Sequence, residues 1–166
     1  KLGPLDILVN NAGTWPTALV RDMSDKEWSG TLAMNLTAPF MTCREALKRW
    51  LATGRKGRIV NITSQAAYHG ATTGHAHYAA AKAGLANFTI SLAREVAAHG
   101  IHVNAVAPGF MATDMAAEAW RKNEARYRER IPLGRIADPS EIAGAVVFLA
   151  SERASYITGQ SIAVDG

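Results

Sequence analysis

Short apolar runs alternate with helical patterns along the whole chain. Four runs are typical of buried strands, at residues 7–9, 58–62, 101–106 and 162–164. Apolar residues at helical spacing predict three long helices, at residues 35–51, 78–99 and 138–149. Strands that are apolar throughout and separated by helices indicate an α/β fold with a parallel sheet covered on both faces.

Local chemistry places the start of one further helix and of the helix at 138–149. Ser24 and Glu27 have the spacing of a capping box, in which each side chain pairs with the other residue's backbone N–H. Asp138 and Glu141 repeat that pattern, with Pro139 at the first helical position. Residues 66–77 form a polar stretch that predicts a loop, and residues 110–130 show a mixed pattern without a clear element.

Composition limits the class of protein. Apolar residues make up 48% of the 166 residues and charged residues 19%, which is typical of a soluble globular protein. No apolar run has the length of a membrane span, and no signal peptide is recognisable. The net charge of +4 is too small and too scattered to indicate nucleic-acid binding.

A single cysteine, Cys43, excludes an intrachain disulfide and fits a reducing compartment, so we expect a cytoplasmic protein. Cys43 lies in a helical apolar pattern and is expected to be a buried filler. His75 and His77 are two residues apart, but no third ligand accompanies them, so we expect no metal site. Trp15 is expected either to border a pocket or to pack in the core.

Five polar segments fall at strand ends or helix starts. They are Asn10-Asn11-Ala12-Gly13; Asn35; Ser64; Tyr78-Ala79-Ala80-Ala81-Lys82; and Pro108-Gly109 with Thr113. In this order and spacing they resemble the short-chain dehydrogenase/reductase family. Residues 78–95 and 104–115 resemble its 3-oxoacyl-carrier-protein reductase branch in particular. The resemblance implies hydride transfer between NAD or NADP and a ketone or secondary alcohol.

The chemistry of Tyr78 and Lys82 agrees with that activity. Four residues apart on a helix, they share one face. A free tyrosine has a pKa of about 10, and a nearby ammonium group lowers it by stabilising the phenolate. Tyr78 can then act as the acid in reduction and the base in oxidation. Ser64 can donate a hydrogen bond to the substrate oxygen. Singly, each residue could equally be an ordinary surface or turn residue.

The resemblance assigns the remaining site residues. It implies that Tyr78 and Lys82 also contact the cofactor, Lys82 by holding the nicotinamide ribose, and that Asn35 supports a water chain to solvent. The turn of Asn11, Ala12 and Gly13 would border the adenosine side of the cofactor. Other cofactor contacts are implied at the next strand end, at Pro108, Gly109 and Thr113. A tight turn that needs small residues is the alternative interpretation for the first segment, and a plain loop is the alternative for Thr113.

The pattern begins at what resembles the fourth strand of the family. We therefore expect a Rossmann-type doubly wound sheet in its C-terminal portion only, as one partial domain over residues 1–166. The first three strands and the glycine-rich phosphate-binding turn are absent from this sequence. A partial gene product, or a record that omits the rest, is favoured over a natural fragment with another purpose.

Substrate and partners follow from the resemblance alone. A 3-oxoacyl thioester is one candidate substrate, and an acyl carrier protein is a candidate partner. Arg55 lies where the branch has a docking residue, but His99 stands where arginine is common. Residues 120–130 resemble a mobile substrate lid, with a solvated helix as the alternative.

We expect a homodimer or homotetramer through the helices at 35–51 and 78–99. Both helices carry apolar residues beyond the needs of one sheet face, among them Trp50, Leu85, Phe88 and Leu92. A non-catalytic fragment or interaction module that keeps the second half of the fold is the alternative to an enzyme.

Overall fold

The computed structural model describes residues 4–166, and for residues 114–119 it gives only the course of the backbone. Four strands form one sheet: β1 (Ile7–Asn10), β2 (Gly57–Ile62), β3 (Ile101–Pro108) and β4 (Ser161–Val164). They lie in the order β1-β2-β3-β4, and every neighbouring pair is parallel. The predicted α/β fold with a parallel sheet is confirmed.

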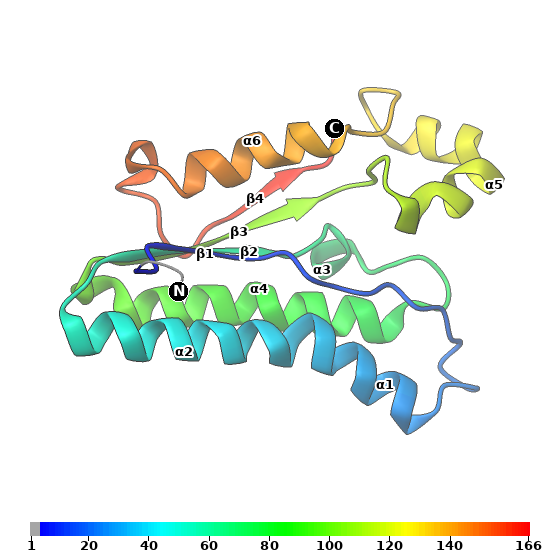
Figure 1. The fold of residues 1–166 in the computed structure, drawn as a ribbon. Helices are drawn as coiled ribbons and strands as arrows, with labels where there is room; N and C mark the ends of the chain where they lie inside the picture. Colours follow the sequence, from blue (N-terminus) through cyan, green and yellow to red (C-terminus); the bar gives the residue numbers. More distant parts are fainter. Residues whose placement is uncertain (1–3) are drawn as a thin grey trace.

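Helices cover both faces of this sheet (Figure 1). The long helices α2 (Ala38–Thr53) and α4 (Ala76–Val96) lie side by side on one face, and α6 (Pro139–Leu149) crosses the other. The shorter α1 (Asp25–Leu32) leads into α2, and the 3-10 turn η2 (Ala97–His99) follows α4. This double covering explains why the strand sequences are apolar at successive positions.

Both predicted capping boxes are present. The Ser24 hydroxyl accepts from the Glu27 amide, and the Glu27 carboxylate accepts from the Ser24 amide at 2.8 Å. Asp138 and Glu141 form the same reciprocal pair at the start of α6. Arg135 adds a two-pronged ion pair to Glu141, with both N–O distances 2.7 Å. Local sequence therefore determines where these two helices begin.

Three segments differ from the sequence-based expectation. A short helix, α3 (Ala66–His69), lies within the predicted loop. The mixed stretch contains a long helix, α5 (Asp114–Arg130), which is interrupted by non-helical backbone at Asn123. Helix α2 does not begin at Asn35, because a π-helical turn, η1 (Ala33–Thr37), joins it to α1. One continuous helical path therefore runs from α1 into α2.

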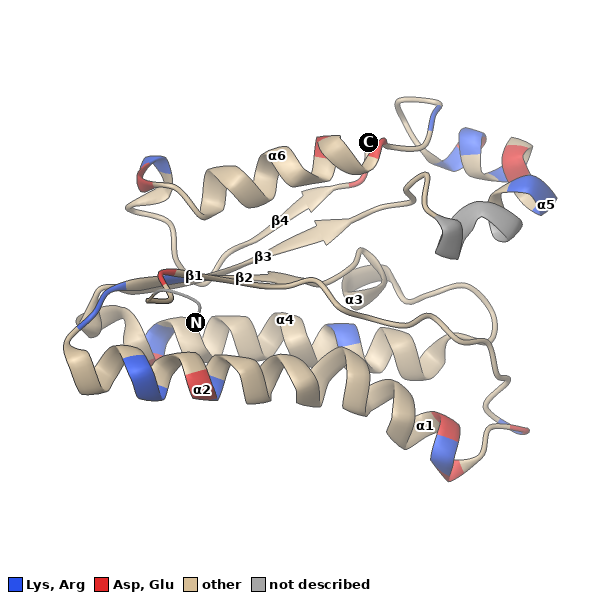
Figure 2. Cartoon of the chain, viewed as in Figure 1, with Lys and Arg blue, Asp and Glu red and all other residues tan. Residues whose placement is uncertain are grey.

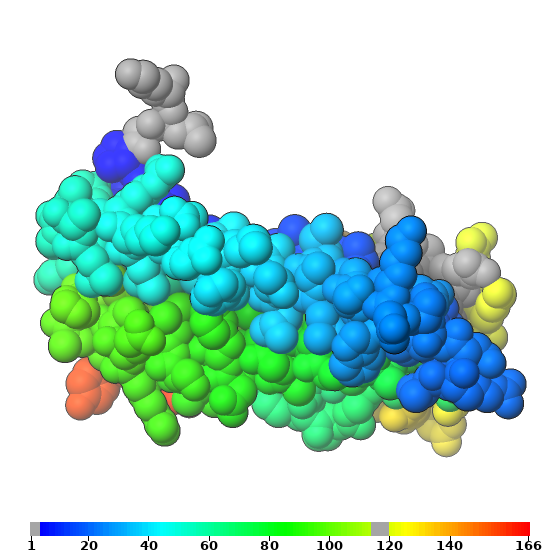
Figure 3. Space-filling view, turned by 90° about the horizontal axis from the view of Figure 1, so that it is seen from below, coloured from blue at the N-terminus to red at the C-terminus, as the bar shows by residue number. Residues whose placement is uncertain are grey.

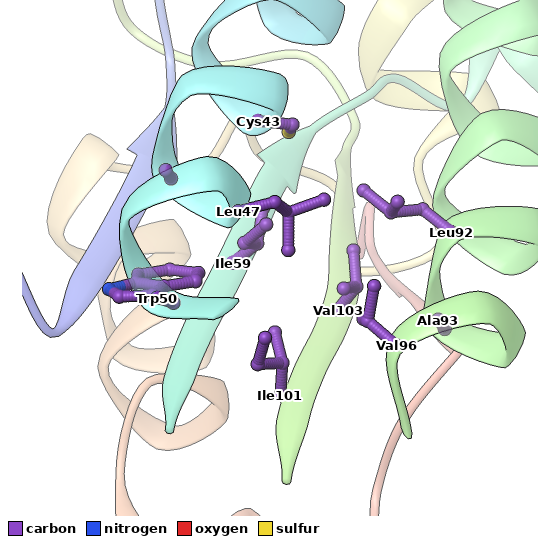
Figure 4. Close-up of a cluster of buried hydrophobic side chains, with 10 residues drawn as sticks. Cys43, Leu47, Trp50, Ile59, Leu92, Ala93, Val96, Ile101 and Val103 are labelled. Carbon is purple, nitrogen blue, oxygen red and sulfur yellow. The ribbon is translucent and has the colours of Figure 1, made fainter. Parts of the chain in front are cut away.

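The core has two layers, one on each side of the sheet. Figure 4 shows the layer between the sheet and α2 and α4, where Leu47, Ile59 and Val103 meet. The other layer packs Val60 and Val106 against α6. Adjacent strand residues such as Ile59 and Val60 enter opposite layers because side chains alternate across a strand. Among the described residues, no helix is long and apolar enough to cross a membrane.

A chain of polar side chains, of which Asn10, Asn61 and Thr89 are buried, crosses the first core layer. Thr42 donates to the Asn10 side-chain oxygen at 2.6 Å, and Asn10 donates to the Asn61 oxygen at 2.8 Å. Asn61 in turn donates to the Thr89 hydroxyl at 2.9 Å. The chain ties β1 and β2 to α4, and it was not predicted from the sequence. Cys43 lies beside it, fully buried as expected, and burial raises the pKa of its thiol to about 11.

Gly57→Ala should destabilise the protein by about 1–3 kcal/mol through overpacking. A Cβ at Gly57 would lie 2.6 Å from the Trp50 ring. That ring is buried and is fixed by a 2.7 Å hydrogen bond from its Nε1 to the Leu5 carbonyl, so it cannot easily move away. The measurement is urea unfolding of the full-length gene product, meaning residues 1–166 with whatever the gene encodes on either side.

Gly30→Ala is the matched control. Gly30 lies in α1, where a Cβ meets nothing within 4 Å, so alanine should stabilise the helix by about 0.5–1 kcal/mol. Equal unfolding midpoints for the two variants would show that the contact between Gly57 and Trp50 is not tight.

Candidate functional site

The predicted site residues gather at the carboxyl edge of the sheet. Ser64 follows the end of β2, and Pro108 ends β3. The Gln65 amide donates to the Pro108 carbonyl at 3.0 Å, so the two strand ends are tied together just beyond Ser64. Tyr78 lies in the first turn of α4, which begins at this edge. This is where open parallel sheets bind ligands, because the strand ends and helix starts converge there.

Tyr78 and Ser64 are close enough to interact. The Tyr78 side chain is half-buried, and burial raises the pKa of its phenol above the ordinary value of 10. A side-chain hydrogen-bonding interaction with Ser64 lowers that pKa again in part. The Ser64 hydroxyl also accepts from the Ala66 amide at 3.1 Å, at the start of α3. Helix α3 therefore orients a hydroxyl that reaches the phenol.

Lys82 lies one helical turn beyond Tyr78, on the same face. Its ammonium group is 5.7 Å from the centre of the Tyr78 ring. The side chain is buried, and Nζ donates to the Ile62 carbonyl at 2.8 Å. Burial lowers the pKa of Lys82 to about 8. The structure thus places Ser64, Tyr78 and Lys82 in one cluster.

The net pKa shift of Tyr78 in this structure is opposite to the expected one, because burial outweighs the other influences on the phenol. The sequence predicted a phenol pKa below its ordinary value, and the pKa is raised instead. Burial disfavours the phenolate, and the Lys82 ammonium is directed at a backbone carbonyl. At neutral pH, Tyr78 is accordingly a neutral phenol that can donate a proton.

Lys82→Met should remove a pH-dependent gain in stability. Because its folded pKa is about 8 and its ordinary value is 10.5, Lys82 loses its proton earlier in the folded state than in the unfolded chain. Below pH 8 the folded protein carries the cost of burying the charge, and this cost disappears as pH rises above 8. Between about pH 8 and about pH 9.5 the wild type should gain roughly 2 kcal/mol relative to the variant.

Urea unfolding of both proteins across that pH range is the measurement. The raised pKa of the buried Cys43 thiol lowers the free energy of unfolding as pH rises above the ordinary thiol pKa of 9.0. This happens in both proteins, so the effect of Cys43 cancels in the comparison. Stability curves that run parallel over the range would contradict the lowered pKa of Lys82.

Asn35 is fully buried in the π-helical turn η1. Its amide group donates to the Thr14 carbonyl at 3.0 Å and to the Thr31 carbonyl at 3.1 Å, and its oxygen accepts from the Thr14 amide at 3.3 Å. The widened turn places the side chain against the loop that follows β1. In this structure Asn35 therefore fixes the course of that loop, while its implied water chain stays a prediction.

Gly13, in the loop that follows β1, packs against Asn35. A Cβ at Gly13 would lie 2.8 Å from the Asn35 Oδ1 atom and 3.6 Å from the Lys82 ammonium nitrogen. The turn therefore passes between two site residues and has no room for a side chain. Asn11 and Ala12, before it, are exposed. The implied role of this turn as a border of the cofactor stays a prediction.

The second predicted cofactor turn has a structural reason for its glycine. A Cβ at Gly109 would lie 2.7 Å from the Asp165 backbone, and the Gly109 amide donates to the Val164 carbonyl at 3.0 Å. Pro108 is buried, and Thr113 precedes α5 with its amide donating to the Met111 carbonyl at 2.9 Å. In the described part of the chain, no hydrogen bond joins Thr113 to Tyr78 or Lys82, so its implied role stays a prediction.

Trp15 and His75 form a contact that sequence reasoning did not find. Their rings stack with centres 4.2 Å apart and planes 13° from parallel. His77 is fully buried, and neither of its ring nitrogens has a hydrogen-bond partner in the described structure. Among the described residues, no group of three His, Cys, Asp or Glu side chains could hold a metal ion. A tryptophan and a histidine 60 residues apart give no local signal of such a stack.

The whole chain, residues 1–166, matches a family model described as enoyl-(acyl carrier protein) reductase. It is 47% identical to the 3-oxoacyl-[acyl-carrier-protein] reductase FabG of Aquifex aeolicus, over 98% of this chain and 64% of that relative. The corresponding Vibrio harveyi enzyme is also 47% identical, over 100% of this chain and 67% of its own length. The chain thus spans about two thirds of the curated relatives that it matches.

Solved structures of oxidoreductases are also similar to this chain. A putative 2-deoxy-d-gluconate 3-dehydrogenase from Agrobacterium tumefaciens with bound NADP has a TM-score of 0.92 at 44% identity, covering 97% of this chain and 66% of its own. A variant actinorhodin polyketide ketoreductase with NADPH has a TM-score of 0.92 at 38% identity, covering 99% and 67%. Only part of the fold of these proteins is present in residues 1–166. On the full-length family match and these relatives, the chain belongs to the short-chain dehydrogenase/reductase family.

Proposed function

We propose that the full-length gene product is an NAD(P)-dependent oxidoreductase that interconverts a ketone and a secondary alcohol. The observation that carries the proposal is the cluster of Ser64, Tyr78 and Lys82 at the carboxyl edge of the sheet. Curated relatives at 47% identity are 3-oxoacyl reductases, which supports the same reaction class. A 3-oxoacyl thioester is the finer candidate for the substrate.

Each residue of the cluster has a distinct task in reduction. The neutral Tyr78 phenol donates its proton to the carbonyl oxygen of the substrate, and its raised pKa keeps it protonated at neutral pH. The Ser64 hydroxyl donates a hydrogen bond to the same oxygen as negative charge develops there. Lys82 stabilises the phenolate that remains, from a buried position on the same helix face.

A nicotinamide cofactor, when bound, supplies or accepts the hydride in this chemistry. The residues present fit its nicotinamide end. Lys82 lies beside the tight Gly13 turn and is available to hold a ribose hydroxyl, and Asn11 and Ala12 are exposed on the same turn. Pro108, Gly109 and Thr113 would border the ring from the next strand end. Bound NADP and NADPH in two matched structures support NADP or NAD as cofactor.

The direct test is an assay of the full-length gene product with NADH and with NADPH. We expect oxidation of one reduced cofactor that depends on a ketone, followed by its absorbance. A simple ketone and a 3-oxoacyl thioester of a small thiol distinguish the coarse proposal from the finer one. Absence of binding to both cofactors would overturn the proposal and favour the non-catalytic interaction module.

The positions of Arg55 and His99 do not support docking of an acyl carrier protein beside the candidate site in residues 1–166. Arg55 precedes β2 and His99 precedes β3, whereas Ser64 follows the end of β2, so these residues lie at opposite ends of the sheet. Arg55 is also paired with Asp6 through two hydrogen bonds of 2.9 and 2.8 Å. Figure 2 places the charges of the α2–β2 turn far from those of α5. A free small-molecule substrate is therefore the first to test.

An exposed apolar surface on α1, α2 and α4 supports a homodimer or homotetramer. These helices form one face of the molecule (Figure 3). Of the residues first expected there, Trp50, Leu85 and Leu92 are buried within the chain, and Phe88 packs edge-on against Phe40. The exposed apolar side chains of these helices and of the turn η1 are others: Trp28, Met34, Phe40, Met41, Leu51 and Ile90. Side chains of this kind are typical of an interface.

Phe40→Glu should reduce self-association of the full-length gene product by at least about tenfold, because a charge would be buried without a partner. Sedimentation velocity across a range of concentrations is the measurement. Val20→Glu, at an exposed position in the loop after β1, is the control and should leave the assembly unchanged. A wild-type protein that sediments as a monomer at micromolar concentration would contradict the proposed assembly.

A further inference from the structure

The first turn of α4, which carries Tyr78, lacks the capping box that begins α1 and α6. Helices α1 and α6 each begin with a capping box. At the start of α4, the His75 side chain makes no capping hydrogen bond, and the first turn contains no acidic residue. Unpaired N–H groups at a helix start favour fraying. Contacts from elsewhere in the fold must therefore hold this turn in place.

Those contacts come from the loop that follows β1. Trp15 stacks on the His75 ring, and the Thr17 hydroxyl lies 3.0 Å from His75 Nε2. On the other side of the ring, Nδ1 lies 3.2 Å from the Thr72 carbonyl oxygen and 3.1 Å from the Thr72 hydroxyl. The tautomer with the proton on Nδ1 satisfies both sides of the ring, because the Thr72 carbonyl can only accept and Nε2 is then free to accept from the Thr17 hydroxyl. We call Trp15, Thr17, Thr72 and His75 the ring clamp.

The loop after β1 and the loop before α4 also meet through their backbones. The Ala18 amide donates to the Gly74 carbonyl at 2.8 Å. Gly74 has a φ of +86°, and a Cβ there would lie 2.7 Å from the Thr17 side chain. Only glycine permits both the backbone conformation and the close approach. The ring clamp is therefore a built junction whose members satisfy one another, and His75 is buried within it.

The junction connects directly to the proton donor. The His75 carbonyl accepts from the Ala79 amide at 3.0 Å, which closes the first helical turn around Tyr78. Trp15 directly follows Thr14. The Asn35 side chain forms hydrogen bonds with both the backbone amide and the backbone carbonyl of Thr14. A displacement of the loop after β1 would therefore be transmitted through the His75 ring to the turn that carries the phenol.

We propose that Trp15 and His75 are positioning residues, which hold the first turn of α4 so that Tyr78 faces Ser64. The inference rests on the proposed function, because it assigns the clamp a part in proton donation. A loosened clamp leaves the phenol present but misplaced, and an error of about 1 Å in a reacting group can cost about a hundredfold in rate. Neither residue needs to touch the substrate for this effect.

The test uses the full-length gene product and four variants. Trp15→Ala removes the stack, Thr17→Val removes one hydrogen bond, and Trp15→Phe restores an aromatic face. Thr73→Val makes the same chemical change as Thr17→Val at an exposed residue in the loop before α4 and serves as the control. Amide hydrogen exchange of residues 76–82 reports on the helix start without any substrate. Steady-state kinetics with a ketone report on proton donation.

We expect Trp15→Ala and Thr17→Val to speed exchange in residues 76–82 and to lower kcat by about tenfold to a hundredfold. The KM for the cofactor should stay within about twofold of wild type, and Trp15→Phe should recover most of kcat. Unchanged exchange would overturn the proposal, as would faster exchange with unchanged kcat.

A third outcome separates this inference from the proposed function. If the wild-type protein turns over no carbonyl compound, the proposed function fails and the proton-donation part of the inference fails with it. The exchange data still decide whether the clamp holds the helix start. If Trp15→Ala does not fold, Thr17→Val and Thr73→Val, which keep every ring, carry the comparison.

Discussion

Tyr78→Phe should lower kcat of the full-length gene product by at least about a hundredfold, because general acid catalysis contributes roughly that much or more. The substitution removes only the phenol oxygen, so the ring keeps its packing at the start of α4. Cofactor binding should stay within about twofold, since the ring is not expected to anchor the dinucleotide. Ketone-dependent oxidation of the reduced cofactor measures kcat, and fluorescence titration measures the affinity for the cofactor.

Tyr156→Phe is the matched control for this result. It makes the same chemical change at a fully exposed tyrosine in the segment between α6 and β4. Its kcat should equal that of the wild type. If Tyr78→Phe retained more than about a tenth of the wild-type kcat, the phenol could not be the main proton donor.

Residues 1–166 expressed alone should bind NADH and NADPH at least about a hundredfold more weakly than the full-length gene product. Affinity in this fold comes largely from a glycine-rich turn that meets the pyrophosphate at a helix N-terminus. No such turn occurs in residues 1–166. The residues expected to touch the nicotinamide end, Lys82, Pro108, Gly109 and Thr113, cannot anchor the dinucleotide by themselves. Isothermal titration of both proteins with each reduced cofactor gives the comparison.

This comparison requires that the shorter chain be folded. Near-ultraviolet circular dichroism reports on Trp50, which is immobilised only when α2 packs on the sheet. With that signal intact, micromolar binding by residues 1–166 would show that the nicotinamide end anchors the cofactor by itself. The prediction would then be wrong, and the contribution of the glycine-rich turn would have to be smaller than supposed.

Elements whose signals lie close together in the sequence were predictable. The capping boxes of α1 and α6 were identified from residues three apart, and the four strands from runs of adjacent apolar residues. The π-helical turn at Asn35 was not, because the hydrogen bonds of Asn35 to Thr14 connect residues 21 positions apart. Helix α3 was hidden for a related reason, since the residues 66–69 carry no helical apolar pattern.

The candidate site also has features that the sequence predicts and features that it does not. The common face of Tyr78 and Lys82 follows from helix geometry, and the structure places both beside Ser64. The direction of the Tyr78 pKa shift could not be predicted, because it depends on how deeply the fold buries the phenol and on where the Lys82 ammonium points. The stack of Trp15 on His75 likewise depends on two loops meeting, which no single stretch of sequence encodes.

The π-helical turn also sets the rotational phase between α1 and α2. A π turn holds one residue more than an α turn, and one residue corresponds to a rotation of about 100°. Deleting a single residue from Ala33–Thr37 would restore regular helix but would turn the stripe of Cys43, Leu47 and Trp50 away from the sheet. The extra residue therefore rotates the face of α2 relative to that of α1. With this rotation, one continuous helical path directs Asn35 at the loop after β1 and the later apolar stripe at the core. Among relatives of this chain, insertions and deletions should avoid this turn more strictly than they avoid either helix end.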